Sequence, residues 1–114
     1  MAYPPVQIKN STEFVASGKV EYRSVFCSDD SYFVTPTTTW TGPGRGVCLV
    51  TKITATVKTP GGDIEATPYT SSGTSYSQFA IIQTGPSSFQ VTRIVTEFED
   101  QPPAGYVEPT TQQK

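Results

Sequence analysis

Histidine is absent from the chain of 114 residues, and only two residues are cysteine. The absence of histidine removes the commonest general base, the histidine-dependent nucleophile triads and most catalytic zinc sites. Two cysteines alone are too few for a structural zinc site. Acidic residues gather at Asp29 and Asp30 and within residues 97–100, and neighbouring acids in a loop are usually solvated charges. The sequence therefore predicts a protein that is not an enzyme, with no catalytic residue, metal or cofactor.

An excess of basic charge is also missing. Eight basic and ten acidic residues give a formal charge of −2, whereas a nucleic-acid partner requires a basic face. No run of about eighteen apolar residues occurs, so the sequence predicts no transmembrane segment. The first ten residues show no hydrophobic leader, which leaves a cytosolic protein, leaderless export or a removed leader open. An extracellular or surface-exposed location is preferred to a cytoplasmic one.

The two cysteines, Cys27 and Cys48, have two interpretations. They could form one disulfide, which would close a loop of about 20 residues and contribute roughly 3 kcal/mol. They could instead be separate buried thiols that act as small hydrophobic side chains, and this second interpretation is slightly preferred. Asn10 begins an Asn-Ser-Thr sequence, which is a glycosylation site if a eukaryote secretes the protein.

Strand-forming residues are abundant, with many Thr and Val and with six Phe and six Tyr. The longest alternating stretch is residues 47–58, whose odd-numbered positions are mostly apolar and whose even-numbered positions are mostly polar. This pattern predicts one long central strand with Ile53 on its apolar face and Lys52 on its polar face. Residues 19–26 alternate in the same way and predict a half-buried strand with Val20, Tyr22 and Phe26 facing inward.

Glycine and proline mark turns throughout the chain, most strongly at residues 41–46 and again at residues 59–63 and 84–88. About seven to nine short strands separated by such turns predict an all-β fold, a small antiparallel β-sandwich of the jelly-roll or Greek-key kind. Residues 47–98 resemble a meander of successive hairpins. The expected organisation is a single domain over residues 1–100, followed by a flexible proline-rich tail over residues 101–114.

Three groups of residues are candidates for ligand contact, each with a structural alternative. Trp40 could stack on a sugar ring, although a core tryptophan is the preferred interpretation. Arg45 and its neighbouring glycines could hold an anion, although a tight turn explains the glycines without a ligand. Asp29 and Asp30 could coordinate calcium, but a polar turn is preferred because the spacing of a known calcium loop is absent.

The hydroxyl-rich stretch between Tyr69 and Tyr76 resembles an adaptable binding loop, and it is equally consistent with a solvated hairpin end. Loops on a rigid sandwich are where recognition residues can vary. The predicted ligand-binding residues, provided that they meet at one end of the sandwich, are Trp40, Arg45, Asp29, Asp30, Tyr69 and Tyr76.

At the level of fold alone, the pattern resembles small β-sandwich lectins, cytolysin-like proteins and assembly subunits, and such a resemblance carries no function. The first hypothesis is a non-enzymatic, lectin-like recognition protein that binds a carbohydrate or another cell-surface ligand through its end loops. The alternative is a self-assembling structural subunit, a symmetric homo-oligomer or filament. A membrane-active, cytolysin-like protein is the third hypothesis, favoured only if exposed aromatic residues cluster.

Overall fold

The computed structural model describes residues 3–94, which form ten β-strands and no helix. The predicted all-β class is confirmed, with more strands than the seven to nine expected. The predicted boundary between residues 100 and 101, and the tail beyond it, lie outside the described residues. The strands are β1 (Gln7–Asn10), β2 (Val15–Tyr22), β3 (Asp30–Val34), β4 (Thr39–Thr41), β5 (Val50–Ile53), β6 (Thr56–Thr59), β7 (Gly62–Glu65), β8 (Tyr69–Thr74), β9 (Gln78–Gly85) and β10 (Ser88–Arg93).

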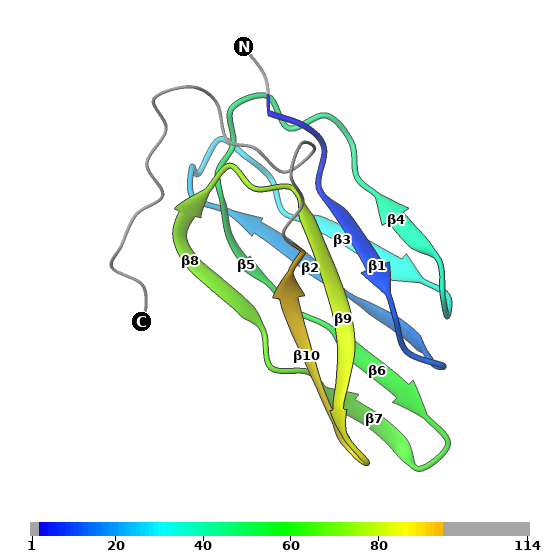
Figure 1. The fold of residues 1–114 in the computed structure, drawn as a ribbon. Helices are drawn as coiled ribbons and strands as arrows, with labels where there is room; N and C mark the ends of the chain where they lie inside the picture. The colour runs from blue at the N-terminus through cyan, green and yellow to red at the C-terminus, as the bar shows by residue number, and fades with distance from the viewer. Residues whose placement is uncertain (1–2, 95–114) are drawn as a thin grey trace.

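The strands form two sheets, as a sandwich requires (Figure 1). One sheet has four strands in the order β10-β9-β1-β4, and β1 and β9 cross in front of β2 in the view of Figure 1. The other has the order β7-β6-β2-β5-β8, with β3 paired to the remaining edge of β2. The pairing is antiparallel except between β1 and β9, which run parallel with Gln7 opposite Gln78. The predicted antiparallel sandwich is therefore confirmed, with one parallel pair added.

The predicted central strand over residues 47–58 is divided in the structure. Residues 47–49 belong to a turn and loop. Strands β5 and β6 are separate and pair with successive parts of the single long strand β2. Ile53 is fully buried, as predicted, but Val50 is buried as well. The register shifts between Val50 and Lys52, and such a bulge reverses the alternation of faces. Val47, predicted to face inward, lies in the turn that precedes β5 and is 67% exposed.

The predicted strand over residues 19–26 is displaced toward the N-terminus. Strand β2 begins at Val15 and ends at Tyr22, and the chain then turns instead of continuing. Val20 is buried as expected, but Phe26 lies in the turn and is 94% exposed. Gly18 is required within β2, because a Cβ at this position would collide with the carbonyl oxygen of Thr54 between β5 and β6.

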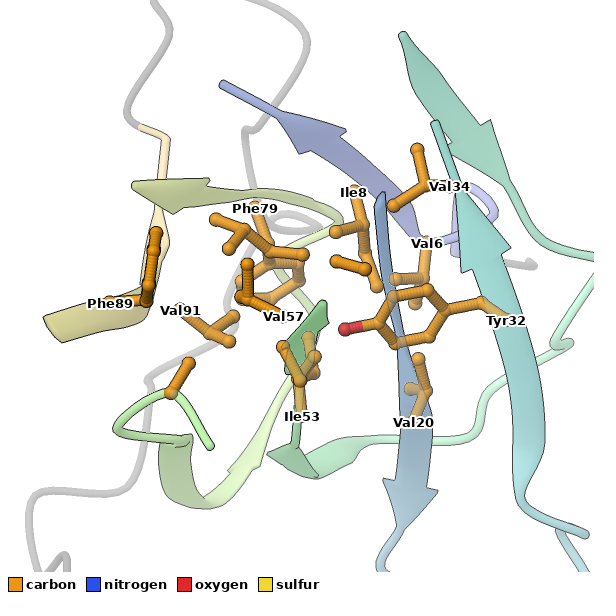
Figure 2. Packing of buried hydrophobic residues seen from close by; sticks show 14 of the residues in the cluster. Val6, Ile8, Val20, Tyr32, Val34, Ile53, Val57, Phe79, Phe89 and Val91 are labelled. Carbon is orange, nitrogen blue, oxygen red and sulfur yellow. The ribbon is translucent and has the colours of Figure 1, made fainter. Parts of the chain in front are cut away.

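The core lies between the two sheets and contains side chains from both (Figure 2). Figure 2 shows Ile8, Phe79 and Phe89 of the four-stranded sheet pointing toward Ile53 and Val57 of the other sheet. All five are at most 2% exposed. Each fully buried side chain of this kind contributes about 1.5–3 kcal/mol relative to an exposed one. This core holds the two layers together.

Asn10 is fully buried, which contradicts the interpretation of its sequence as a glycosylation site. Its Nδ2 donates to the carbonyl oxygens of Phe14 and Val34 at 2.6 and 3.2 Å. Its Oδ1 accepts from the backbone N–H and the hydroxyl of Thr12. The amide nitrogen is therefore occupied in holding the turn between β1 and β2, and an oligosaccharide has no access to it in the folded protein.

Two of the predicted hairpins are present, but the predicted meander is not. Strands β6 and β7 join at Thr59 and Gly62, and Gly62 has the positive φ of 127° that this tight turn requires. Strands β9 and β10 form the second hairpin. Between these hairpins the chain changes sheets, because β8 pairs with β5 whereas β9 pairs with β1. The prediction of successive hairpins over residues 47–98 is wrong, because chain order alone does not determine which strands pair.

Candidate functional site

Two turns at one end of the sandwich are joined by a disulfide. The N–H of Cys27 donates to the carbonyl of Ser24 at 3.0 Å, and the N–H of Cys48 donates to the carbonyl of Arg45 at 2.9 Å. Each turn thus ends on a cysteine, and the two cysteines are bonded with their Cα atoms 6.2 Å apart. We refer to residues 24–27 and 45–48 as the linked turns. The preferred interpretation of separate thiols was wrong, and the disulfide alternative is confirmed.

The central positions of the linked turns carry apolar side chains. Val25 and Phe26 occupy them in the first turn and are 92% and 94% exposed. Gly46 and Val47 occupy them in the second turn, with Gly46 at a φ of 55°. Central turn positions normally hold Gly, Pro, Asn, Asp or Ser, which tolerate water and unusual dihedral angles. Three of the four large hydrophobic residues exposed within residues 3–94 therefore lie on the linked turns, the fourth being Phe33.

Arg45 is the first residue of the second linked turn. Its side chain is directed inward, and the residue is only 5% exposed. Its Nε donates to the carbonyl of Pro4 at 2.8 Å, and its Nη1 donates to the carbonyl of Cys48 at 3.2 Å. Its Nη2 donates to the carbonyls of Ser75 and Tyr76 at 2.6 and 3.0 Å. The guanidinium therefore fastens the second turn to the N-terminal segment and to the connection between β8 and β9. The prediction that Arg45 presents its guanidinium to a ligand at the surface is wrong, because carbonyl oxygens of the protein occupy it.

A hollow of about 150 Å³ lies beside the disulfide, with Tyr22, Asp30 and Arg45 among the residues that line it. The hydroxyl of Tyr22 donates to Oδ2 of Asp30 at 2.6 Å. Burial, followed by this hydrogen bond and by the charge of Asp30, raises the pKa of Tyr22, since a phenolate would lie beside a carboxylate. The hydroxyl therefore remains a protonated donor at neutral pH. Asp29, which was also predicted to bind a ligand, precedes Asp30 in the sequence and is exposed.

The aromatic residues predicted to bind a ligand contact other parts of the protein. The ring of Trp40 lies 5.5 Å from the ring of Tyr32, and a Cβ at Gly42 would lie 2.7 Å from the Trp40 ring. Trp40 is therefore half-buried and packs against the core. Tyr69 also packs against the core, with its ring 4.8 Å from that of Phe79.

The backbone of Tyr76 lies at the same end of the molecule, where its carbonyl accepts a hydrogen bond from Arg45. Its ring lies 3.4 Å below the guanidinium carbon of Arg93, an arrangement that favours a cation–π interaction. The structure thus brings Asp30, Arg45 and the backbone of Tyr76 together. Trp40 and Tyr69 have structural roles within the sheets.

Sequence reasoning missed the most exposed part of this site. Val25 and Phe26 immediately precede Cys27, and Val47 immediately precedes Cys48. Because residues 19–26 and residues 47–58 were predicted to be strands, the alternation of apolar and polar residues assigned Phe26 and Val47 to inward faces. The available signal was the repeated placement of an apolar residue directly before each cysteine, which becomes meaningful once the cysteines are known to be bonded.

No protein-family model, no curated protein and no solved structure matches this chain. The part of the chain that the structure describes contains no helix long and apolar enough to cross a membrane. Within residues 3–94, no three His, Cys, Asp or Glu side chains are grouped as metal ligands would be.

Proposed function

We propose that this protein is a non-enzymatic recognition protein that binds a cell-surface protein through the linked turns. The observation that carries this proposal is the exposure of Val25, Phe26 and Val47 at the central positions of two turns joined by a disulfide. Clusters of exposed apolar residues mark sites of interaction, because the contact of apolar side chains with water is energetically unfavourable. The partner would supply an apolar pocket for the Phe26 ring, the kind of anchor that dominates protein interfaces.

The supports beneath the linked turns strengthen this proposal. The disulfide joins the two turns, and three hydrogen bonds from Arg45 fix the second turn to neighbouring segments, while a fourth closes the turn on Cys48. A loop that is already held in its bound shape loses less conformational entropy when a partner binds. The linked turns therefore present their apolar side chains at a lower entropic cost than two free loops would.

A protein partner is favoured over a glycan because the polar and aromatic side chains predicted to bind a sugar are packed against, or bonded to, other parts of the protein. A sugar-binding surface offers an open aromatic face together with several side-chain donors and acceptors. Here Trp40 packs on Tyr32, and the guanidinium of Arg45 is bonded to backbone carbonyls. The large side chains that are exposed at the linked turns, those of Val25, Phe26 and Val47, are apolar, which suits an apolar pocket in a protein.

A protein partner is also favoured over a lipid bilayer. Burying Val25, Phe26 and Val47 would contribute roughly 5–9 kcal/mol at about 1.5–3 kcal/mol for each side chain. This is comparable to one myristoyl chain, which gives marginal and reversible membrane binding on its own. Asp29 and Asp30 follow the first turn closely and would be repelled by anionic headgroups. Membrane activity is therefore the weaker interpretation of the same surface.

Substitution of Phe26 with serine tests the proposal. Fluorescently labelled protein would be titrated onto intact cells, and the Phe26→Ser variant should bind about thirtyfold more weakly, equivalent to roughly 2 kcal/mol. The matched control is Phe33→Ser, which removes an exposed phenylalanine from β3 and should leave cell binding unchanged. Circular dichroism and melting temperature should be the same for all three proteins.

Treatments of the cell surface identify the class of ligand. Trypsin treatment of the cells should abolish binding, whereas glycosidase treatment should not. Binding that survives trypsin and appears on vesicles of phosphatidylcholine would replace the protein partner by a lipid surface. Equal binding by the Phe26→Ser variant and the unmodified protein would refute the role of the linked turns.

A further inference from the structure

Strand β3 lies at an open edge of the six-stranded sheet. It pairs with β2 along Asp30–Val34, and no other strand of the described residues is paired with its remaining edge. At the end of this strand, Nδ2 of Asn10 donates to the backbone carbonyl of Val34 at 3.2 Å. An unpaired strand edge presents a row of backbone donors and acceptors that another strand can use.

The side chains of β3 leave this edge unprotected. Tyr32 and Val34 face the core, whereas Ser31 and Phe33 face outward, with Phe33 59% exposed. Natural edge strands are commonly protected by lysine, proline or a bulge. Strand β3 has none of these within its bounds, and its one charged residue is Asp30 at its first position.

The other edges of the two sheets are less suited to pairing. Strand β7 carries Asp63 and Glu65, and β4 has three residues. Strand β10 is already approached by Thr67, which forms a bridge to Gln90. Strand β8 carries no exposed large hydrophobic residue. Phe33 is the one exposed large hydrophobic residue that lies on a strand within residues 3–94.

We infer that β3 is a self-association surface, on which β3 of a second copy pairs in antiparallel orientation about a two-fold axis at Tyr32. Such an isologous contact needs no second sequence, because the same surface supplies both sides. Pairing centred on Tyr32 places Ser31 of each copy opposite Phe33 of the other. The two Phe33 rings then lie diagonally across the new strand pair, within the reach of aromatic side chains.

Charge does not oppose this arrangement. Each Asp30 lies opposite Val34 of the other copy, so the two carboxylates are separated by four residues along the strands. At about 3.3 Å per residue this is roughly 13 Å, which exceeds the Debye length of about 8 Å at physiological ionic strength. The contact therefore brings no pair of like charges together.

The expected dimer is weak. Stable, specific interfaces begin at about 1,200 Å² of total buried surface, and two strands of five residues each bury less than this. The dimer should therefore form and dissociate with concentration. This self-association goes beyond the proposed recognition function, because it uses β3 instead of the linked turns.

Sedimentation velocity of the full chain over a range of concentrations tests the inference. The average mass should rise above the 12.3 kDa of one chain as the concentration increases, and it should approach that of a dimer. The variants Phe33→Lys and Ser31→Lys should both remain monomeric, since a lysine protects an edge. Ser31 is exposed, so its substitution tests the edge even if the Phe33 variant folds poorly.

The matched control is Phe26→Ser, which removes a more exposed phenylalanine from the linked turns and should dimerise normally. A monomer at every concentration would refute the inference. Loss of the dimer in Phe26→Ser, with both lysine variants still dimeric, would also refute it and assign self-association to the linked turns. Because Phe26→Ser tests cell binding and Ser31→Lys tests dimerisation, either proposal can fail while the other stands.

Discussion

Replacement of Arg45 with alanine should strongly destabilise the protein. The guanidinium bonds to carbonyl groups from three separate segments, at Pro4, at Cys48 and at Ser75 with Tyr76. Truncation of the side chain leaves these acceptors without their donors and opens a space beneath the second of the linked turns. The sequence alone placed Arg45 among the predicted ligand-binding residues instead.

The magnitude of the loss follows from the burial of the four hydrogen bonds. A hydrogen bond to a charged group contributes about 1.5–3 kcal/mol, and the bond to the carbonyl of Ser75 is fully buried. The other three are partly buried, so water can replace part of each. The total should be about 3–5 kcal/mol, a large share of the roughly 5–15 kcal/mol that stabilises a domain.

Urea denaturation provides the assay, with the fluorescence of Trp40 as its signal because the chain has one tryptophan. With a slope of about 1–3 kcal/mol per molar urea, a loss of about 4 kcal/mol lowers the midpoint by roughly 2 M. The control variant is Arg23→Ala, an exposed arginine near the same end, which should change stability by less than about 0.5 kcal/mol. A loss below about 1 kcal/mol in Arg45→Ala would refute the reasoning.

Three further predictions concern stability. Because burial raises the pKa of Tyr22 and Tyr32 above 10.0, the unfolded chain alone releases these protons above about pH 10. Stability measured by urea titration should fall there by up to about 1.4 kcal/mol per pH unit for Tyr32, less for half-exposed Tyr22, and a flat profile would contradict this. Gly18→Ala should lower the free energy of unfolding by about 2–3 kcal/mol, because the added Cβ collides with Thr54. Gly44→Ala, with open space around it, should not, and equal urea midpoints for the two variants would disprove the collision. Reduction of the disulfide, which spans a sequence separation of 21, should cost about 3 kcal/mol and lower the melting temperature, and an unchanged melting curve would exclude this contribution.

The parts of the fold that sequence reasoning predicted depend on local patterns. The alternation of apolar and polar residues placed Ile53 and Val20 inside, and both are fully buried. Glycine and proline located the hairpin turn between β6 and β7, because the tight turn at Gly62 needs a positive φ. These signals act over a few residues, so a single sequence contains them in full.

The parts that were missed depend on contacts between distant residues. Alternation assigned Phe26 and Val47 to the interior, but the disulfide and two short turns hold both outside. Arg45 is buried because four carbonyl groups, three of them at least 30 residues away, surround its guanidinium. No local pattern reveals such acceptors, so the sequence did not predict the burial of the Arg45 side chain.

The parallel pairing of β1 with β9 has a consequence for folding order. Residues 7–10 are synthesised well before residues 78–81, with which they pair. Contacts between such distant segments close only after the loop-closure entropy of the intervening chain has been overcome, which slows folding. The pairing of β1 with β9 therefore waits until residues 78–81 have been synthesised, even though β4 is made earlier. During that interval the chain is more vulnerable to aggregation than the finished sandwich is.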